Sequence, residues 1–148
     1  MTQSAVDIKP RSFAALMDLY EYNYLRLKRI APELDIADRM ISVSDGHLDL
    51  YLDVTERCKF TTTIRLTYRF DQDAEQVSQP DMHIKIYHDA RNAEVLDRLD
   101  RRHRRVYSGE TLQEKWRMNR FLYKWLGYCI FQNHYFHPIS RPARYQQP

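Results

Sequence analysis

The sequence predicts one α+β domain, in which an N-terminal helix, a four-stranded antiparallel meander and two C-terminal helices pack on the sheet. Three observations predict it. Apolar residues recur at helical spacing near both ends of the chain, and they alternate with polar residues through its middle. The 148 residues are enough for one hydrophobic core without disulfides or metal. We expect residues 1–137 to form this single domain and residues 138–148, with their prolines and arginines, to form a flexible basic tail.

The first helix is predicted from Ser12, a favourable N-cap, to Pro32, which ends it. Its apolar residues fall on one side, at Phe13, Leu16, Met17, Tyr20, Tyr24, Leu27 and Ile30. Asn23 lies within this apolar arc. We expect it to be a hydrogen-bonded amide in the core.

Four strands are predicted from alternation of apolar and polar residues. Residues 40–44 and 48–54 read as two strands joined by a tight hairpin at Asp45-Gly46. Residues 60–70 and 82–87 give the third and fourth strands. The short links between strands favour an antiparallel meander over a parallel sheet.

Helical spacing returns after the fourth strand. Asp89 is a possible cap, and the apolar residues that follow it on one side are Val95, Leu96, Leu99 and Val106. Ser108-Gly109 then interrupts the pattern before a long helix predicted over 110–133. This last helix has a wide apolar arc that includes Trp116, Phe121 and Trp125, which predicts that it is the main core helix.

Several classes of function have no support in the sequence. The three glycines are too dispersed for a phosphate-binding or dinucleotide-binding loop, so no cofactor is expected. The two cysteines form no Cys-x-x-Cys pair, and His134-x-x-His137 lacks further ligands nearby, so we expect reduced thiols and no metal. The N-terminus lacks the apolar run of a signal peptide, and the longest apolar stretch is far too short to cross a bilayer. We therefore expect a cytoplasmic protein.

The charge distribution points to an anionic partner. Residues 1–97 hold 12 Lys and Arg against 17 Asp and Glu, a net of −5, whereas residues 98–148 hold 11 against 3, a net of +8. The candidate anion-binding residues are Arg101, Arg102, Arg104, Arg105, Arg117, Arg120 and Lys124. Such residues neutralise phosphates, and nearby aromatic side chains can stack on unpaired bases. The alternative is that they are solvated helix surface that keeps the protein soluble.

The favoured hypothesis is thus a non-enzymatic binding or regulatory domain whose partner is a nucleic acid, a nucleotide or an acidic protein. A second hypothesis is an enzyme or small-ligand receptor that uses His88, Asp89 and Arg91 at the end of the fourth strand, where a base, an anion-binding arginine and a helix N-terminus would meet. No nucleophile lies beside them in the sequence. A third is a structural role in a homodimer or larger assembly, through exposed tyrosines and a sheet edge.

Four separated segments carry a resemblance to a known family. They are Leu16-Met17-x-Leu-Tyr-Glu-x-Asn-Tyr, Phe60-Thr-Thr, Tyr87-His-Asp-Ala and Lys115-Trp-x-x-Asn-x-Phe-Leu-x-x-Trp-Leu. Together they resemble the YqiB-like domain of unknown function, an uncharacterised bacterial family, over most of residues 10–136. The resemblance implies a small cytoplasmic bacterial protein. It brings no activity, cofactor or catalytic residue with it.

Overall fold

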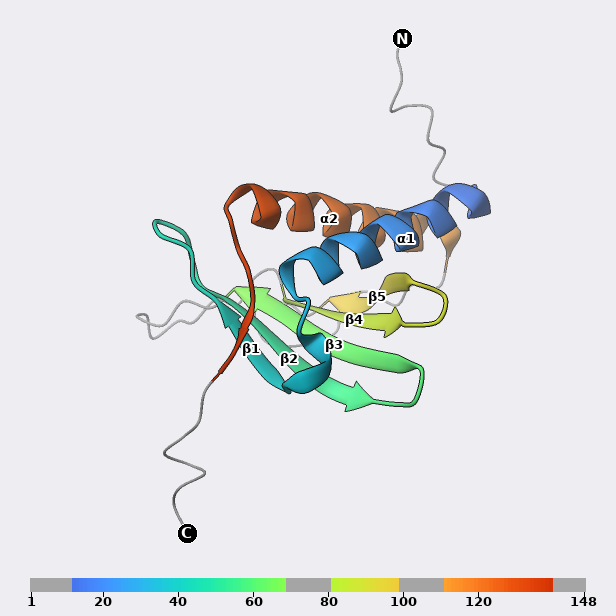
Figure 1. Ribbon diagram of the computed structural model, residues 1–148. Helices are drawn as coiled ribbons and strands as arrows, with labels where there is room; N and C mark the ends of the chain where they lie inside the picture. Colours follow the sequence, from blue (N-terminus) through green and yellow to red (C-terminus); the bar gives the residue numbers. More distant parts are fainter. Residues whose placement is uncertain (1–11, 69–80, 99–110, 140–148) are drawn as a thin grey trace.

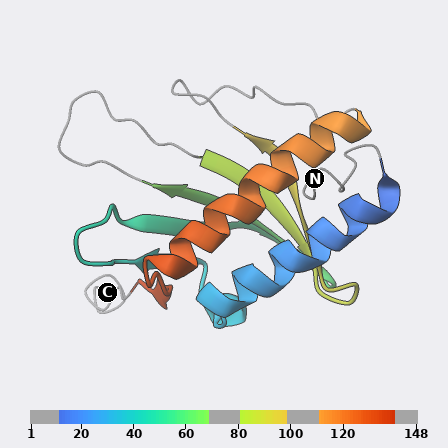
Figure 2. The same ribbon diagram turned by 90° about the horizontal axis from the view of Figure 1, so that it is seen from above.

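The computed structural model describes residues 12–68, 81–98 and 111–139. In these ranges two α-helices lie side by side on one face of a six-stranded sheet, and no described helix covers the other face (Figures 1 and 2). The elements in chain order are α1 (Phe13–Ile30), the 3-10 helix η2 (Leu34–Ile36), β1 (Arg39–Ser42), β2 (Leu50–Arg57), β3 (Thr61–Tyr68), β4 (Asp81–Tyr87), β5 (Asn92–Arg98), α2 (Leu112–Phe131) and β6 (His137–Pro138).

All neighbouring strands are antiparallel, in the order β5-β4-β3-β2-β1-β6. The α+β class is as the sequence predicts, but the expected set of elements is wrong. The described residues form six strands where four are expected, and one α-helix after the meander where two are expected. The two additional strands, β5 and β6, form the two edges of the sheet.

Strand β5 replaces the helix predicted after Asp89. Residues 88–91 form a turn, and β5 then pairs with β4 as a hairpin. The register shifts so that Val95 lies opposite Ile84 and Asp97 lies opposite His83, which leaves Leu96 as an extra residue. This bulge breaks the alternation of apolar and polar residues, and the break makes a short strand resemble a helix in the sequence. The rest of the predicted helix lies outside the described residues.

Strand β6 is two residues long and pairs with β1 at Met40 and Ile41. A pair of residues has no detectable period, so no strand is expected there. Pro138, the first residue of the predicted tail, belongs to this strand, and the Ile139 N–H donates to the Arg39 carbonyl at 3.0 Å.

The first hairpin is present, but β1 ends two residues before the predicted end of the first strand and β2 begins two residues after the predicted start of the second. Asp45-Gly46 forms a turn closed by a hydrogen bond from the His47 N–H to the Ser44 carbonyl at 2.9 Å, and Gly46 has a φ of +78°. A positive φ at this turn position favours glycine. The turn sits in a seven-residue loop, from 43 to 49, rather than directly between the strands.

The helix ends are defined by local hydrogen bonds. The Ser12 hydroxyl accepts from the Ala15 N–H at the start of α1, which confirms the predicted cap. Thr111 and Glu114 form a reciprocal capping box at the start of α2. The chain leaves α2 through Asn133, whose φ is +67°, a left-handed residue of the kind that commonly terminates helices.

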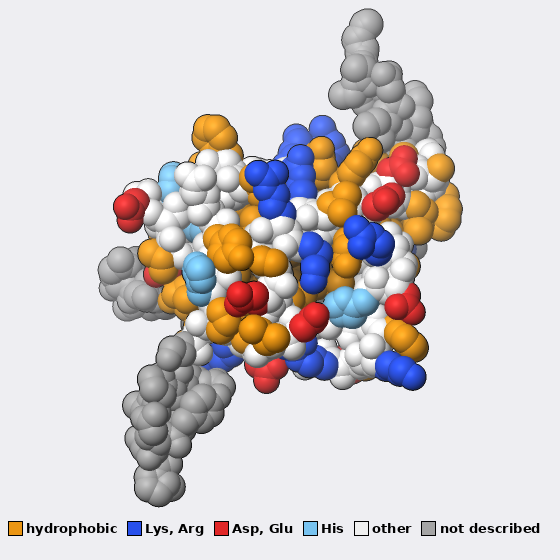
Figure 3. Space-filling view, viewed as in Figure 1, with side chains coloured by type: hydrophobic (Ala, Val, Ile, Leu, Met, Phe, Trp, Pro, Cys, Tyr) orange, Lys and Arg blue, Asp and Glu red, His pale blue; other side chains and the backbone are white. Residues whose placement is uncertain are grey.

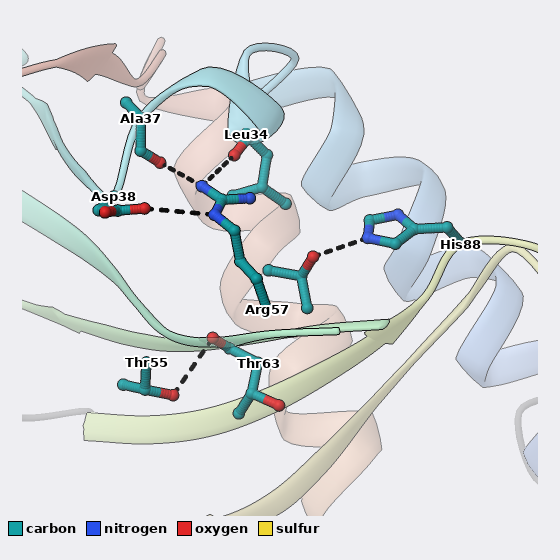
Figure 4. Close-up of polar contacts among 8 residues, drawn as sticks. Leu34, Ala37, Asp38, Thr55, Arg57, Thr63 and His88 are labelled. Atoms are coloured by element: carbon teal, nitrogen blue, oxygen red, sulfur yellow. Dashed lines mark hydrogen bonds and ion pairs between the residues drawn. The ribbon is translucent and has the colours of Figure 1, made fainter. Parts of the chain in front are cut away.

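Arg57 fixes the link between α1 and β1 (Figure 4). Its Nη2 donates to the Leu34 and Ala37 carbonyls at 3.0 and 2.7 Å, and its Nε donates to Asp38 at 3.2 Å. These bonds satisfy carbonyls around the short 3-10 helix, which therefore stays attached to the end of β2.

The helices pack against the sheet through a continuous apolar core. The core residues contributed by the sheet include Leu52, Ile64 and Ile84, and α2 contributes Leu122 and Leu126, all fully buried. The inner side of α2 thus belongs to the core as predicted, but α2 is not the main core helix, because α1 also buries a full side, including Leu27 and Ile30.

Candidate functional site

The outer side of α2 carries three basic residues on one stripe. Arg117, Arg120 and Lys124 are exposed, and we call them the basic α2 face. At 1.5 Å per residue the stripe extends about 10 Å along the helix axis. None of the three forms an ion pair with another residue in the described part of the chain.

Aromatic side chains lie among these cations. Trp116 and Phe121 line the same hollow of about 380 Å³ as the basic α2 face, and Gln113 completes its lining. Phe121 is 44% exposed, although the sequence places it in the apolar arc. The centroid of its ring lies 6.3 Å from that of the buried Trp125. One side of the Phe121 ring therefore packs against the core, and the other side stays accessible. In Figure 3 Lys and Arg side chains gather at the upper edge of the molecule, over the helices, with hydrophobic ones between them.

The basic side chains on the face of the sheet opposite the two α-helices are arranged differently. Arg65 donates two hydrogen bonds to Asp81, at 2.7 and 2.6 Å, and this hydrogen bonding raises the pKa of Arg65. His83 Nδ1 lies 2.8 Å from Asp97. Both acidic partners are buried, so each pair is locally compensated. Among the described residues, Arg65 and His83 thus have acidic partners, whereas the three cations of the basic α2 face form no ion pair.

The remaining predicted anion-binding residues, Arg101, Arg102, Arg104 and Arg105, lie outside the described residues. They precede α2 directly in the sequence.

The second predicted site, His88, Asp89 and Arg91, occupies the β4–β5 turn. His88 Nε2 is 2.7 Å from the Thr62 hydroxyl, a contact drawn in Figure 4, and Arg91 lies over the Tyr24 ring at 5.1 Å. No helix begins at Asp89, so the helix N-terminus on which the anion-binding argument depended is absent. The observed contacts attach the turn to β3 and to α1.

The four segments that carry the family resemblance contact one another in pairs. The first meets the fourth where Asn23 Nδ2 donates to the Asn119 carbonyl at 3.2 Å. The second meets the third where the His88 N–H donates to the Phe60 carbonyl at 3.0 Å, beside the Thr62 contact. The predicted role of Asn23 as a bonded core amide is confirmed.

Asn119 was not singled out from the sequence, yet it joins three elements. Its Oδ1 accepts from the Val95 N–H of β5 at 2.8 Å, and its Nδ2 donates to the Lys115 carbonyl at 2.8 Å. The available signal was an asparagine inside the apolar arc of α2, as in α1. A buried amide at such a position needs partners on neighbouring elements.

The two histidines considered as metal ligands do not form a site. His134 is buried with its Nδ1 2.7 Å from the Ser42 hydroxyl, whereas His137 is exposed on β6. Burial, followed by the charge of His47, lowers the pKa of His134. Within the described ranges no three His, Cys, Asp or Glu residues are placed to hold a metal ion. Neither of the two described α-helices combines the length and the apolar character needed to cross a membrane.

Comparison with known proteins agrees with the resemblance found in the four segments. Residues 26–135 match the model of the family described as Protein of unknown function (DUF1249). The Uncharacterized protein YqiB of Escherichia coli strain K12 is 28% identical over 130 residues, which cover 80% of this chain and 88% of that protein. The protein of the same name from Escherichia coli O157:H7 matches to the same extent. No solved structure matches significantly. The chain therefore belongs to the DUF1249 family of proteins of unknown function.

Proposed function

We propose that this protein is a non-enzymatic binding domain that contacts single-stranded nucleic acid through the basic α2 face. The observation that supports this is a combination around one hollow: three cations with no ion-pair partner among the described residues, the exposed ring of Phe121 and the half-buried ring of Trp116. Cations neutralise phosphates, and exposed rings stack on bases that are free of pairing. An acidic protein could also pair with the cations, but it offers no bases to stack on the aromatic rings, so the rings would add less to its binding.

The proposal predicts a specific dependence on salt. For single strands the logarithm of affinity falls with the logarithm of salt concentration with a slope of roughly −0.7 per phosphate contact. Three cations thus give a slope of about −2. Arg101, Arg102, Arg104 and Arg105 are part of the same proposal on sequence grounds, and their participation would make the slope steeper.

The experiment is a fluorescence anisotropy titration of the full chain against labelled single-stranded RNA, single-stranded DNA and duplex DNA across a salt series. The test variant is Arg120→Glu, and the matched control is Lys59→Glu, which makes the same change in net charge on the β2–β3 turn. We expect Arg120→Glu to weaken single-strand binding about tenfold or more. The slope of log affinity against log salt concentration should become less steep by about the contribution of one phosphate contact. Lys59→Glu should change both quantities little.

Two further variants separate the parts of the proposal. Trp116→Leu should weaken single-strand binding more than duplex binding, since only unpaired bases offer a face for stacking. Arg102→Glu combined with Arg105→Glu tests the cluster that precedes α2. Absence of binding to every nucleic acid at low ionic strength would refute the proposal, as would equal losses in Arg120→Glu and Lys59→Glu.

A further inference from the structure

A second hollow lies at the C-terminal end of α2, away from the basic α2 face. It has a volume of about 490 Å³ between the end of the helix and the loop that joins β1 to β2. Figures 1 and 2 both show this loop beside the last turn of α2. The residues that line it are Val43, Ser44, Asp45, His47, Tyr128, Phe131, Gln132 and Asn133. We call it the α2-end hollow.

The electrostatics of the α2-end hollow favour a cation. The C-terminus of a helix carries a partial negative charge, which basic residues in the last turn can offset. The last turn of α2 contains no basic residue. The exposed carboxylate of Asp45 adds negative charge, and the lining contains no Lys or Arg. Of the residues that line the hollow, His47 alone can carry a positive charge.

A buried acceptor in the lining has no partner. Gln132 is 8% exposed, and its Oε1 accepts no hydrogen bond among the described residues. Leaving such an oxygen buried and unbonded costs about 1–3 kcal/mol in ordinary proteins. The Gln132 main chain is held in place, since its carbonyl accepts from the Ser44 hydroxyl at 2.5 Å. The Oε1 atom is itself buried, so a donor in the hollow reaches it once the Gln132 side chain turns toward the hollow.

Two exposed aromatic rings line the α2-end hollow together with Gln132. Phe131 is 81% exposed and Tyr128 is 56% exposed, although both belong to a helix that is otherwise packed on the sheet. In Figure 3 a hydrophobic side chain protrudes at the upper left of the molecule, with His and acidic side chains further to the left. Ring faces attract cations, and they accept the planar guanidinium more readily than other cations because it can also stack.

We propose that the α2-end hollow binds a guanidinium group, as carried by an arginine side chain. The accessible features match that group: the Asp45 carboxylate and the helix C-terminus meet its charge, and the exposed rings of Phe131 and Tyr128 can cover its plane. The Gln132 side chain, turned toward the hollow, would add an acceptor for one N–H. This inference does not depend on the nucleic-acid proposal, because it uses a different surface and a ligand of opposite charge.

The test is a two-dimensional NMR titration of the isotope-labelled full chain with N-acetyl-L-arginine amide. N-acetyl-L-citrulline amide, which has nearly the same shape without the charge, and N-acetyl-L-lysine amide, which has the charge without the plane, serve as comparison ligands. For the arginine compound we expect saturable shifts at residues of the α2-end hollow, with a Kd on the order of 1 mM for a ligand of this size. The other two compounds should bind about tenfold more weakly.

Variants connect the binding to named groups. Asp45→Asn, Gln132→Met and Phe131→Ala should each weaken the arginine compound about threefold to tenfold, in line with the loss of one exposed contact. Glu33→Gln and Phe13→Ala remove an exposed acid and an exposed ring elsewhere and should leave the Kd unchanged. No saturable binding, equal binding of the citrulline compound, or shifts that map to another surface would overturn the proposal. Equal binding of the lysine compound would overturn the assignment to guanidinium.

Discussion

Replacing Asn119 by leucine tests whether one buried amide fixes the position of β5 against α2. The side chain is fully buried, and it accepts from the Val95 N–H and donates to the Lys115 carbonyl, each at 2.8 Å. Val95 is itself only 3% exposed, so its N–H has no access to water in the folded protein. Leucine has a similar size, which keeps the packing while it removes both bonds.

The cost follows from what each partner loses. A buried N–H left without an acceptor costs about 1–3 kcal/mol. Loss of the bond to the Lys115 carbonyl costs less, because that carbonyl can still accept a main-chain hydrogen bond within the helix. Burial of the apolar leucine side chain offsets part of the total cost. We expect the free energy of unfolding to fall by about 2–3 kcal/mol, which lowers the Tm by about 5–10 °C for a chain of this length.

Asn23 provides a matched control. It is also fully buried, but it makes one hydrogen bond, to the Asn119 carbonyl, and its Oδ1 has no partner among the described residues. Asn23→Leu removes this unbonded oxygen along with the bond, so the two effects offset each other. We expect a change within about 1 kcal/mol, although the two residues are of the same type and equally buried.

Urea unfolding followed by tryptophan fluorescence measures both variants, with an unchanged m-value as the sign that the folded state is intact. Hydrogen exchange at the Val95 amide adds a local readout. Its protection should drop in Asn119→Leu and persist in Asn23→Leu. A loss below about 0.5 kcal/mol for Asn119→Leu, or equal losses in the two variants, would show that the amide contributes no more than packing.

Two other predictions concern buried titratable groups. Burial raises the pKa of Cys129 to about 12, whereas Cys58 is exposed, so a thiol reagent such as DTNB at pH 8 should label one cysteine per native chain and a second only after unfolding. Burial lowers the pKa of His134 below its ordinary 6.5. Just below pH 6.5 the imidazole is therefore protonated in the unfolded chain and neutral in the folded one. The contribution of His134 to the free energy of unfolding should therefore be complete above pH 6.5 and fall as the pH drops below it. Urea titrations between pH 7 and pH 5 measure this. The free energy of unfolding should depend less steeply on pH in His134→Gln than in the original chain, by up to about 1.4 kcal/mol per pH unit.

The elements that could be predicted from the sequence are those with a long, uninterrupted pattern. Both α-helices and the first four strands satisfy this condition, and the Ser12 cap and the Asp45-Gly46 turn have local residue signatures. Strand β5 could not be predicted because the bulge at Leu96 gives its apolar residues the spacing of a helix. The positions of Val95 and Asp97 are set by pairing with β4 and by Asn119, which lies 24 residues away from Val95 in the chain.

The candidate site was predictable in part for a similar reason. The basic α2 face follows from helical spacing alone, because residues three and four apart share a side of a helix. The exposure of Phe121 does not follow, since a wide apolar arc does not indicate which of its edges the sheet covers. The α2-end hollow depends on a loop more than 80 residues earlier in the chain, and no local pattern brings that loop to the end of α2.

The family resemblance and the proposed binding depend on different residues of the same helix. In the fourth segment, Lys115-Trp-x-x-Asn-x-Phe-Leu-x-x-Trp-Leu, Arg117, Arg120 and Lys124 all fall at the positions that the pattern leaves open. Asn119, which the pattern specifies, binds β5 and accepts from α1. Some of the residues that identify the family thus make contacts that hold the fold together. The resemblance does not predict the basic α2 face, because its three residues are not part of the shared pattern. A relative with the same four segments and neutral residues at those three positions should fold in the same way and fail to bind nucleic acid.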